Sequence, residues 1–364
     1  MGGRRGQVCS ETPLILSYFH DEYFSLPSSL RYIKDVHDMN AIHQPSDLTF
    51  HTDIDPDSLW PSANRTYSAT VTETSRALAE NLKLTGPSLL SYPDVLQKVV
   101  QITTNLITKK HPCQLDMGEE DADLSDLEIT EFEWLIVDSA MDVVSGLAAA
   151  LGPSFGELWK IFEKHVMRYA SGAESLERAS ACGVLAEVIT GMGAAVSPYT
   201  KAIMTVLLKR LGDEDPQTKS NAAYAVGRLV EKSEDSNTVT KAYPTIMQKL
   251  EPLLQIEDGR CMDNAAGCVA RLVLAHKDRV PVPEVLPALV NSGVLPLKED
   301  YQENEPVWKM IISLYREHDP TVQRLTPQLA PMMISVLGEP EDQLTDEVRA
   351  ELTALVEHLK STHG

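Results

Sequence analysis

From about residue 68 onward, apolar residues recur at the spacing of α-helices, and the alternation typical of strands is scarce. Turn residues separate these helix-length segments at regular intervals. One unit can be followed in full: an apolar first helix at 198–211, a turn at 212–216 and a second helix at 218–232. Asp215 is predicted to cap the second helix, because Pro216 after it suits a first helical turn.

The same pattern repeats along the chain. Segments 221–230 and 264–273 are identical at seven of ten positions and lie 43 residues apart. The same ten-residue pattern also fits 180–189, which lies 41 residues before 221–230, and 139–148, which lies another 41 residues before that. It fits 306–315 more loosely. This period is that of HEAT and armadillo repeats and is longer than those of tetratricopeptide or ankyrin repeats. It predicts an all-α HEAT/armadillo-type helical-repeat solenoid of about six to seven repeats.

The second helices of these units are expected to line a concave face. They are predicted at 68–84, 129–151, 174–192, 216–232, 259–277, 302–318 and 345–360.

Two stretches, 1–67 and the acidic run between Lys110 and Lys160, break the period. Residues 1–67 carry five prolines and are predicted to be irregular, 68–360 form the solenoid, and 361–364 are a short tail. Between Lys110 and Lys160 there are twelve acidic residues and no Lys or Arg. We expect an acidic loop at 111–128. It is either a solvated loop without a partner or a docking strip for a basic segment.

Composition narrows the class of function. The 364 residues carry a formal net charge of −21 and are 43% hydrophobic, which is enough for a core. This acidity argues against direct nucleic-acid binding and favours basic partners. We find no apolar run near the roughly 18 residues that span a bilayer, so no membrane insertion is expected.

Chemical motifs are scarce. The five cysteines form no CxxC and are expected to be reduced, buried thiols. No histidine or cysteine spacing indicates a metal site, and we expect no metal and no cofactor. The sequence lacks GxSxG, P-loop, GxGxxG and HExxH patterns, so an enzyme is not expected.

What remains is a surface that could bind a cation. Glu257 and Asp258 are adjacent at the turn entering a helix that carries Asp263 and Asn264, and Asn221 is equivalent to Asn264 one repeat earlier. Carboxylates and amide oxygens suit a lysine ammonium, so these residues are predicted to form a cation site across two repeats.

Each candidate also has a structural interpretation. Asp258 could be a helix N-cap, and Asn221 and Asn264 could form a hydrogen-bond ladder between repeats. Tyr224 could form an apolar wall of the site or pack in the core. Trp308 could likewise pack in the core.

Three segments resemble the C-terminal part of the importin-β (karyopherin-β) family. They are 131–152, 214–227 and 263–272, and the resemblance covers roughly 68–360. It is strongest to the fungal branch that imports ribosomal proteins and core histones. The resemblance implies a receptor that wraps basic cargo in its concave face, crosses the nuclear pore and releases cargo to Ran-GTP.

The implied partners are core histones, ribosomal proteins, Ran-GTP and nucleoporins, and the implied location is the cytoplasm and nucleus. The positions implied to hold a cargo lysine are Asn221, Glu257 and Asp258, with Glu131 or Glu133. Family members are much longer, and their N-terminal repeats carry most Ran and pore contacts. We therefore expect the cargo-binding C-terminal region of a truncated receptor. The alternatives are a HEAT scaffold or regulatory subunit, and a histone escort adaptor without transport activity.

Overall fold

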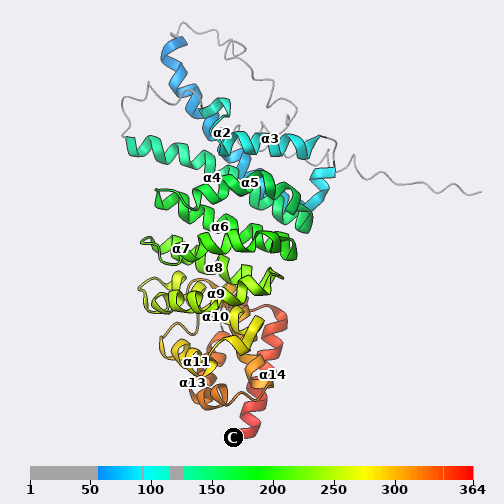
Figure 1. Ribbon diagram of the computed structural model, residues 1–364, viewed down its shortest axis with the longest axis vertical. Coiled ribbons are helices and arrows are strands. Elements are labelled where there is room, and N and C mark those ends of the chain that lie inside the picture. Colours follow the sequence, from blue (N-terminus) through cyan, green and yellow to red (C-terminus); the bar gives the residue numbers. More distant parts are fainter. Residues whose placement is uncertain (1–55, 92–93, 115–125, 339, 364) are drawn as a thin grey trace, which may run out of the picture.

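The computed structural model describes residues 56–91, 94–114, 126–338 and 340–363, and every regular element in this part of the chain is helical (Figure 1). The α-helices stack along the long axis, from α2 to α14. Their bounds are α2 Pro56–Thr85, α3 Val95–Ile107, α4 Asp126–Leu151, α5 Phe155–Tyr169, α6 Ser175–Met192, α7 Thr200–Arg210, α8 Pro216–Lys232, α9 Ser236–Leu250, α10 Gly259–His276, α11 Val282–Asn291, α12 Asn304–Arg316, α13 Pro320–Val336 and α14 Asp346–His363.

The helices form two layers. Helices α2, α4, α6, α8, α10, α12 and α14, here called the inner layer, pack each on the next. The outer layer is formed by α3, α5, α7, α9, α11 and α13. Within the described residues, six consecutive pairs from α3–α4 to α13–α14 follow α2, which confirms a helical-repeat solenoid of six to seven units. The inner-layer helices are the predicted second helices.

Some predicted boundaries are wrong. Helix α2 begins at Pro56, so the helical part starts before residue 68, and α14 reaches His363, inside the predicted tail. Helix α4 begins at Asp126, so the end of the predicted acidic loop is helical. Residues 1–55, and 115–125 within that loop, lie outside the described residues.

Short polar side chains start several helices. The Asp215 carboxylate accepts a hydrogen bond from the Thr218 backbone N–H at 2.7 Å, which confirms the predicted N-cap of α8. Asp319 caps α13 in the same way, through the Thr321 N–H at 2.9 Å. In both helices a proline follows the cap, where its missing N–H costs nothing.

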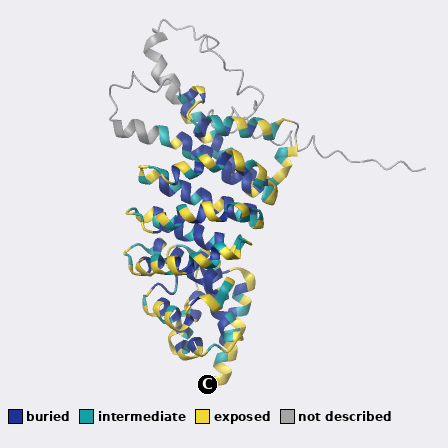
Figure 2. Cartoon of the chain, viewed as in Figure 1, coloured by how far each residue is buried: buried dark blue, intermediate teal, exposed yellow. Residues whose placement is uncertain are grey.

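The core runs continuously between the two layers (Figure 2). Trp159 and Trp308 are fully enclosed, so both belong to the core. The four described cysteines are buried free thiols, as expected for small apolar fillers: Cys113, Cys182, Cys261 and Cys268. The core therefore joins all repeats instead of dividing the chain into separate domains.

Two glycines let inner-layer helices approach backbone to backbone. A Cβ atom on Gly146 of α4 would lie 2.8 Å from the Ala79 carbonyl oxygen of α2. A Cβ on Gly191 of α6 would lie 2.6 Å from the Ala148 carbonyl of α4. Real Cβ atoms do not come this close to backbone, so both contacts require glycine.

Hydropathy also identifies two stretches of membrane-spanning length, contrary to the expectation from sequence. They are Glu133–Tyr169 and Ser175–Arg210, and 67% and 56% of their most apolar windows are buried inside the solenoid. Buried core helices pass the same length and composition test, so these stretches are weak evidence for a membrane span.

We expect opposite effects from adding one methyl group at two helical glycines. Gly146→Ala should lower the free energy of unfolding by about 1–2 kcal/mol, because overpacking outweighs the gain in helix propensity. Gly156→Ala, whose Cβ would meet its nearest atoms at 3.7 Å, should instead raise it by about 0.5–1 kcal/mol. Urea unfolding of both variants tests this, and stabilisation by Gly146→Ala would contradict the close helix approach.

Candidate functional site: a charged hollow on the inner layer

A large recess lies on the inner layer. It has a volume of about 1100 Å³ and is lined by residues of α8, α10 and α12, by residues 299–303, and by residues 342–345 before α14. We call it the hollow. It lies on the helices that were predicted to line the concave face.

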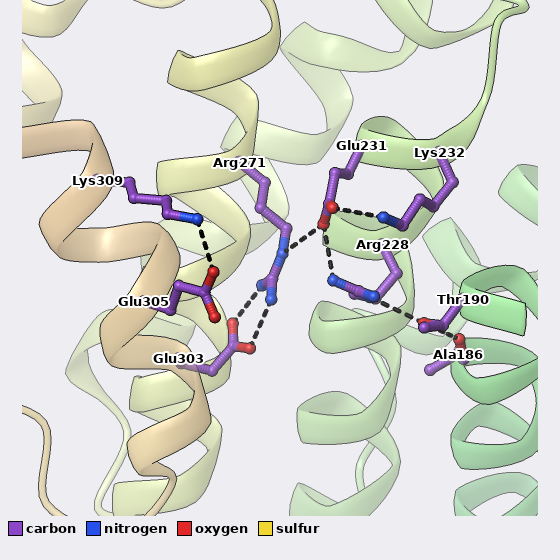
Figure 3. A network of polar contacts seen from close by, with 9 residues as sticks. All are labelled: Ala186, Thr190, Arg228, Glu231, Lys232, Arg271, Glu303, Glu305 and Lys309. Atoms are coloured by element: carbon purple, nitrogen blue, oxygen red, sulfur yellow. Dashed lines mark hydrogen bonds and ion pairs between the residues drawn. The ribbon is translucent and has the colours of Figure 1, made fainter. Parts of the chain in front are cut away.

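A buried ion pair forms one wall of the hollow. The guanidinium of Arg271 on α10 binds the carboxylate of Glu303 through two nitrogens, one of them at 2.8 Å (Figure 3). The side chains are only 6% and 1% exposed. Burial opposes the charge on Arg271, but the hydrogen bonds and charge of Glu303 outweigh it and raise the Arg271 pKa.

The network continues toward the N-terminal repeats. Glu231 on α8 accepts from Arg271 at 3.2 Å, from Arg228 at 2.8 Å and from Lys232 at 2.8 Å. Arg228 also donates to the Thr190 hydroxyl of α6 at 2.8 Å. The polar links therefore join three successive inner helices, α6, α8 and α10, to Glu303 in the turn before α12, and Figure 3 shows this chain of contacts with the separate Lys309–Glu305 pair of α12 beside it.

Two glycines on successive inner helices make room for this wall. A Cβ on Gly227 would lie 3.2 Å from the Arg271 side chain. A Cβ on Gly267 would occupy the place of the Glu303 carboxylate. The Arg271–Glu303 pair therefore lies directly on the backbones of α8 and α10.

Residues 298–303, here called the strap, lie across α10. The Asp263 carboxylate accepts three backbone N–H bonds from the strap: Lys298 at 3.1 Å, Glu299 at 2.8 Å and Asp300 at 2.9 Å. Asp263 is 1% exposed, and burial raises its pKa although these bonds favour the ionised form. The strap is thus held by Asp263 at its start and by Arg271 at its end.

The charges that the hollow leaves without an internal partner are mostly negative. Arg228 and Arg271 are paired with Glu231 and Glu303, and Lys309 is paired with Glu305 at 2.7 Å. Among the described residues no cation lies within ion-pair distance of the three remaining carboxylates, and one lining cation, Arg260, has no ion pair. Those carboxylates belong to Glu299, Asp300 and Asp342.

Apolar surface accompanies these charges. Leu274 lines the hollow and is 43% exposed, which is unusual for a leucine in this solenoid. Tyr224 is half-buried, and its ring faces the guanidinium groups of Arg271 and Arg228, at 5.5 and 6.0 Å from the ring centroid. Its aromatic face is therefore already occupied by cations of the chain itself.

The predicted asparagines serve contacts between repeats. Asn221 donates to the Ala179 carbonyl oxygen at 2.8 Å, and Asn264 donates to the Ser220 hydroxyl at 2.9 Å. Asn264 is 3% exposed, whereas Asn221 is half-buried. Asn264 and Asp263 thus point into the solenoid, contrary to the expectation that they face a ligand. The hydrogen-bond ladder proposed as the alternative is present.

The acidic candidates are also dispersed. Asp258 caps α10 by accepting from the Cys261 N–H at 2.8 Å, and Glu257 beside it is exposed. Neither lines the hollow. Glu133 is paired with Lys109 at 2.9 Å, and the side chain of Glu131 lies outside the described residues. Of the predicted site residues, only Tyr224 lines the hollow.

Sequence reasoning missed Arg228, Arg271, Glu231 and Glu303. A signal for the arginines was present, because both occupy the same position of the ten-residue repeat, next to buried apolar residues. A buried arginine requires a carboxylate partner. No pattern in the sequence identified Glu303 as that partner.

A second acidic region lies nearer the N-terminal end of the inner layer. Asp142 on α4 is half-buried, with Asp138 on the same helix and Lys83 and Arg76 on α2. Burial, and then the charge of Asp138, raise the pKa of Asp142 to about 6. This carboxylate is held ionised at neutral pH at a cost to stability.

We expect a large loss of stability when the buried ion pair is broken. Glu303→Gln should lower the free energy of unfolding by about 3 kcal/mol, because it leaves the Arg271 charge buried without a counter-charge. The exposed pair is the control: Glu305→Gln should cost less than about 1 kcal/mol. Equal losses in urea unfolding would contradict this difference.

Asp142→Asn should stabilise the protein at neutral pH. The folded pKa of about 6 lies above the ordinary value of 3.8, so the folded state binds more protons between these values and its stability falls as pH rises. Removing the charge should therefore add about 1–2 kcal/mol at pH 7, after allowance for partial exposure, and little at pH 4. Urea unfolding at both pH values measures this. Exposed Asp278→Asn is the control, and a pH-independent effect would contradict the expectation.

Comparison with known proteins agrees with this architecture. A family model described as IPO5-like TPR repeats matches residues 135–291. The chain is 36% identical over 270 residues to the probable importin subunit beta-4 of Schizosaccharomyces pombe, which covers 72% of this chain and 25% of that relative. It is 30% identical over 290 residues to importin-4 of Homo sapiens, with coverages of 79% and 26%. The chain thus spans about a quarter of the length of these relatives.

Solved structures show the same fold. A Kap121p mutant superposes with a TM-score of 0.53 at 17% identity, over 90% of this chain and 27% of that one. Importin beta crystallised in a polyethylene glycol condition gives a TM-score of 0.52 at 15% identity, over 82% and 41%. The structures show the shared fold, and the sequence relatives give the assignment: the chain belongs to the importin-β family.

Proposed function

We propose that this chain is a cargo-binding part of a nuclear import receptor and holds basic segments of proteins such as core histones or ribosomal proteins on its inner layer. In this proposal the chain is a binding protein and not an enzyme. Its cargo is bound from the cytoplasm and released in the nucleus, and Ran-GTP and nucleoporins are partners of the receptor as a whole.

The observation that carries the proposal is the charge balance of the hollow. Three of its four lining cations are neutralised by carboxylates of the chain, whereas Glu299, Asp300 and Asp342 have no cation among the described residues. A lysine or arginine entering the hollow meets carboxylates without displacing an internal ion pair. Exposed Leu274 could contact the aliphatic stem of such a side chain.

The candidates from the sequence have separate roles in this proposal. Exposed Glu257, together with Asp258 and Asn221, would add contacts outside the hollow, and Tyr224 would close its wall. Asp263 and Asn264 would act indirectly, by fixing the shape of the inner layer. Glu131 and Glu133 would add acidic positions near the start of α4. Several weak contacts are needed, because one exposed ion pair contributes at most about 1 kcal/mol.

The test is binding of a fluorescent core-histone tail peptide to the whole chain, at low and at high salt. We expect the triple variant Glu299→Gln, Asp300→Asn, Asp342→Asn to weaken binding at least about tenfold and to flatten the salt dependence, because exposed charges have been removed. A copy of the peptide with its lysines changed to alanine should bind weakly to every variant.

Two controls make the result specific. Glu234→Gln removes one exposed charge from the turn between α8 and α9, outside the hollow, and should leave affinity unchanged. Glu257→Gln should weaken binding about two- to threefold if this carboxylate contributes one exposed contact. Equal binding of lysine and alanine peptides would reject a cargo groove and favour a scaffold that binds folded partners.

A further inference from the structure

We infer that the strap, residues 298–303, is a built-in positioning element for the hollow, and that Asp263 acts through it to set the affinity for lysine- or arginine-rich segments. This inference rests on the proposed function. It assigns Asp263, which we predicted to contact a ligand directly, a different role as a positioning residue.

The first support is the way the strap is attached. Consecutive backbone N–H groups of Lys298, Glu299 and Asp300 all converge on one carboxylate oxygen of Asp263. This arrangement fixes the backbone that carries the Glu299 and Asp300 side chains, both of which line the hollow. Two of its three unpaired carboxylates are therefore placed by one buried residue.

The second support is the other end of the strap. Glu303 is anchored on Arg271 and occupies the space that a side chain at position 267 would need. Between these anchors the strap has no helix of its own beyond the single turn Tyr301–Glu303. Without Asp263 its first half would lose its three hydrogen bonds to α10, so Glu299 and Asp300 would no longer be held facing the hollow.

The third support is the buried negative charge of Asp263. An aspartate buried to 1% exposure is costly unless its oxygens are bonded, and its bonds here all go to the strap. Asp300 lies close enough to raise the pKa of Asp263 further by repulsion. A cation bound in the hollow would relieve that repulsion, so binding and strap order should strengthen each other.

The experiment compares Asp263→Ala with Asp263→Asn in the whole chain. The asparagine oxygen can still accept the backbone bonds, whereas alanine cannot. Hydrogen exchange of the 298–300 amides reports strap order without any ligand. A lysine-rich fluorescent peptide, titrated at low and high salt, reports the hollow.

We expect Asp263→Ala to speed exchange at 298–300, to weaken peptide binding about tenfold and to reduce its salt dependence, since two carboxylates lose their position. Asp263→Asn should keep amide protection and bind within about twofold of the wild type. Asp235→Ala, which removes the N-cap of α9 away from the hollow, is the matched control and should leave binding unchanged.

A second variant tests the charges of the strap while leaving the buried Asp263 unchanged. Glu299→Gln/Asp300→Asn keeps the strap anchored and removes its charges, so it should weaken binding as much as Asp263→Ala without changing exchange at 298–300. Adding Asp263→Ala to it should cost no further affinity.

The outcomes separate the two proposals. If the wild-type chain does not bind the lysine-rich peptide, the proposed function fails, and the strap inference with it. If the wild type binds and Asp263→Ala loses amide protection but keeps full affinity, the strap inference alone is overturned. The strap inference would also be overturned if Asp263→Ala and Asp235→Ala changed the affinity for the lysine-rich peptide equally.

Discussion

Polar groups buried between inner-layer helices have to find their partners in the adjacent repeat, and the arrangement of the solenoid depends on this requirement. Asn221 bonds to α6, Asn264 to α8, and Arg178 of α6 pairs with Asp213 at 2.9 Å in the turn before α8. Each repeat contacts little beyond its neighbours, so these bonds fix how successive helices are aligned. The apolar core alone would tolerate several alignments.

The same requirement shapes the charge pattern of the inner layer. Arginines that reach the inner layer are neutralised where they are buried, as Arg271 is by Glu303. Carboxylates left over at the surface keep their charge. In the proposed function, selectivity for cations would therefore depend on which groups are paired inside the chain, and it would not follow from net charge alone.

The fold was largely predictable because its signals are local and repeated. The ten-residue repeat located five of the seven inner helices, and Asp215 with Pro216 predicted the first residue of α8. Errors occurred at the ends, where the period fades, as with α2 beginning at Pro56. The close approach of the helices at Gly146 did not follow from the repeat, because the equivalent positions carry Glu187, Arg228 and Arg271.

The site was less predictable, because its geometry depends on contacts between residues that do not recur with the sequence repeat. Arg271 and Glu303 are 32 residues apart, and Glu303 belongs to an irregular segment between helices. Asn264 and Asp263 were correctly placed on an inner helix, but their direction was wrong. Asp263 satisfies backbone groups of the strap, and an acidic residue next to an asparagine carries no sign of that partner.

The strap also affects how α12 is aligned on α10. Helices α10 and α12 pack less extensively on each other than α8 and α10 do, and charged and hydrogen-bonded groups bridge part of the difference. A two-pronged ion pair also holds a more fixed direction than apolar packing alone. The alignment of α12 on α10 is therefore expected to depend on the Arg271–Glu303 pair and the Asp263–strap bonds more than the alignment of α8 on α10 depends on any single polar contact.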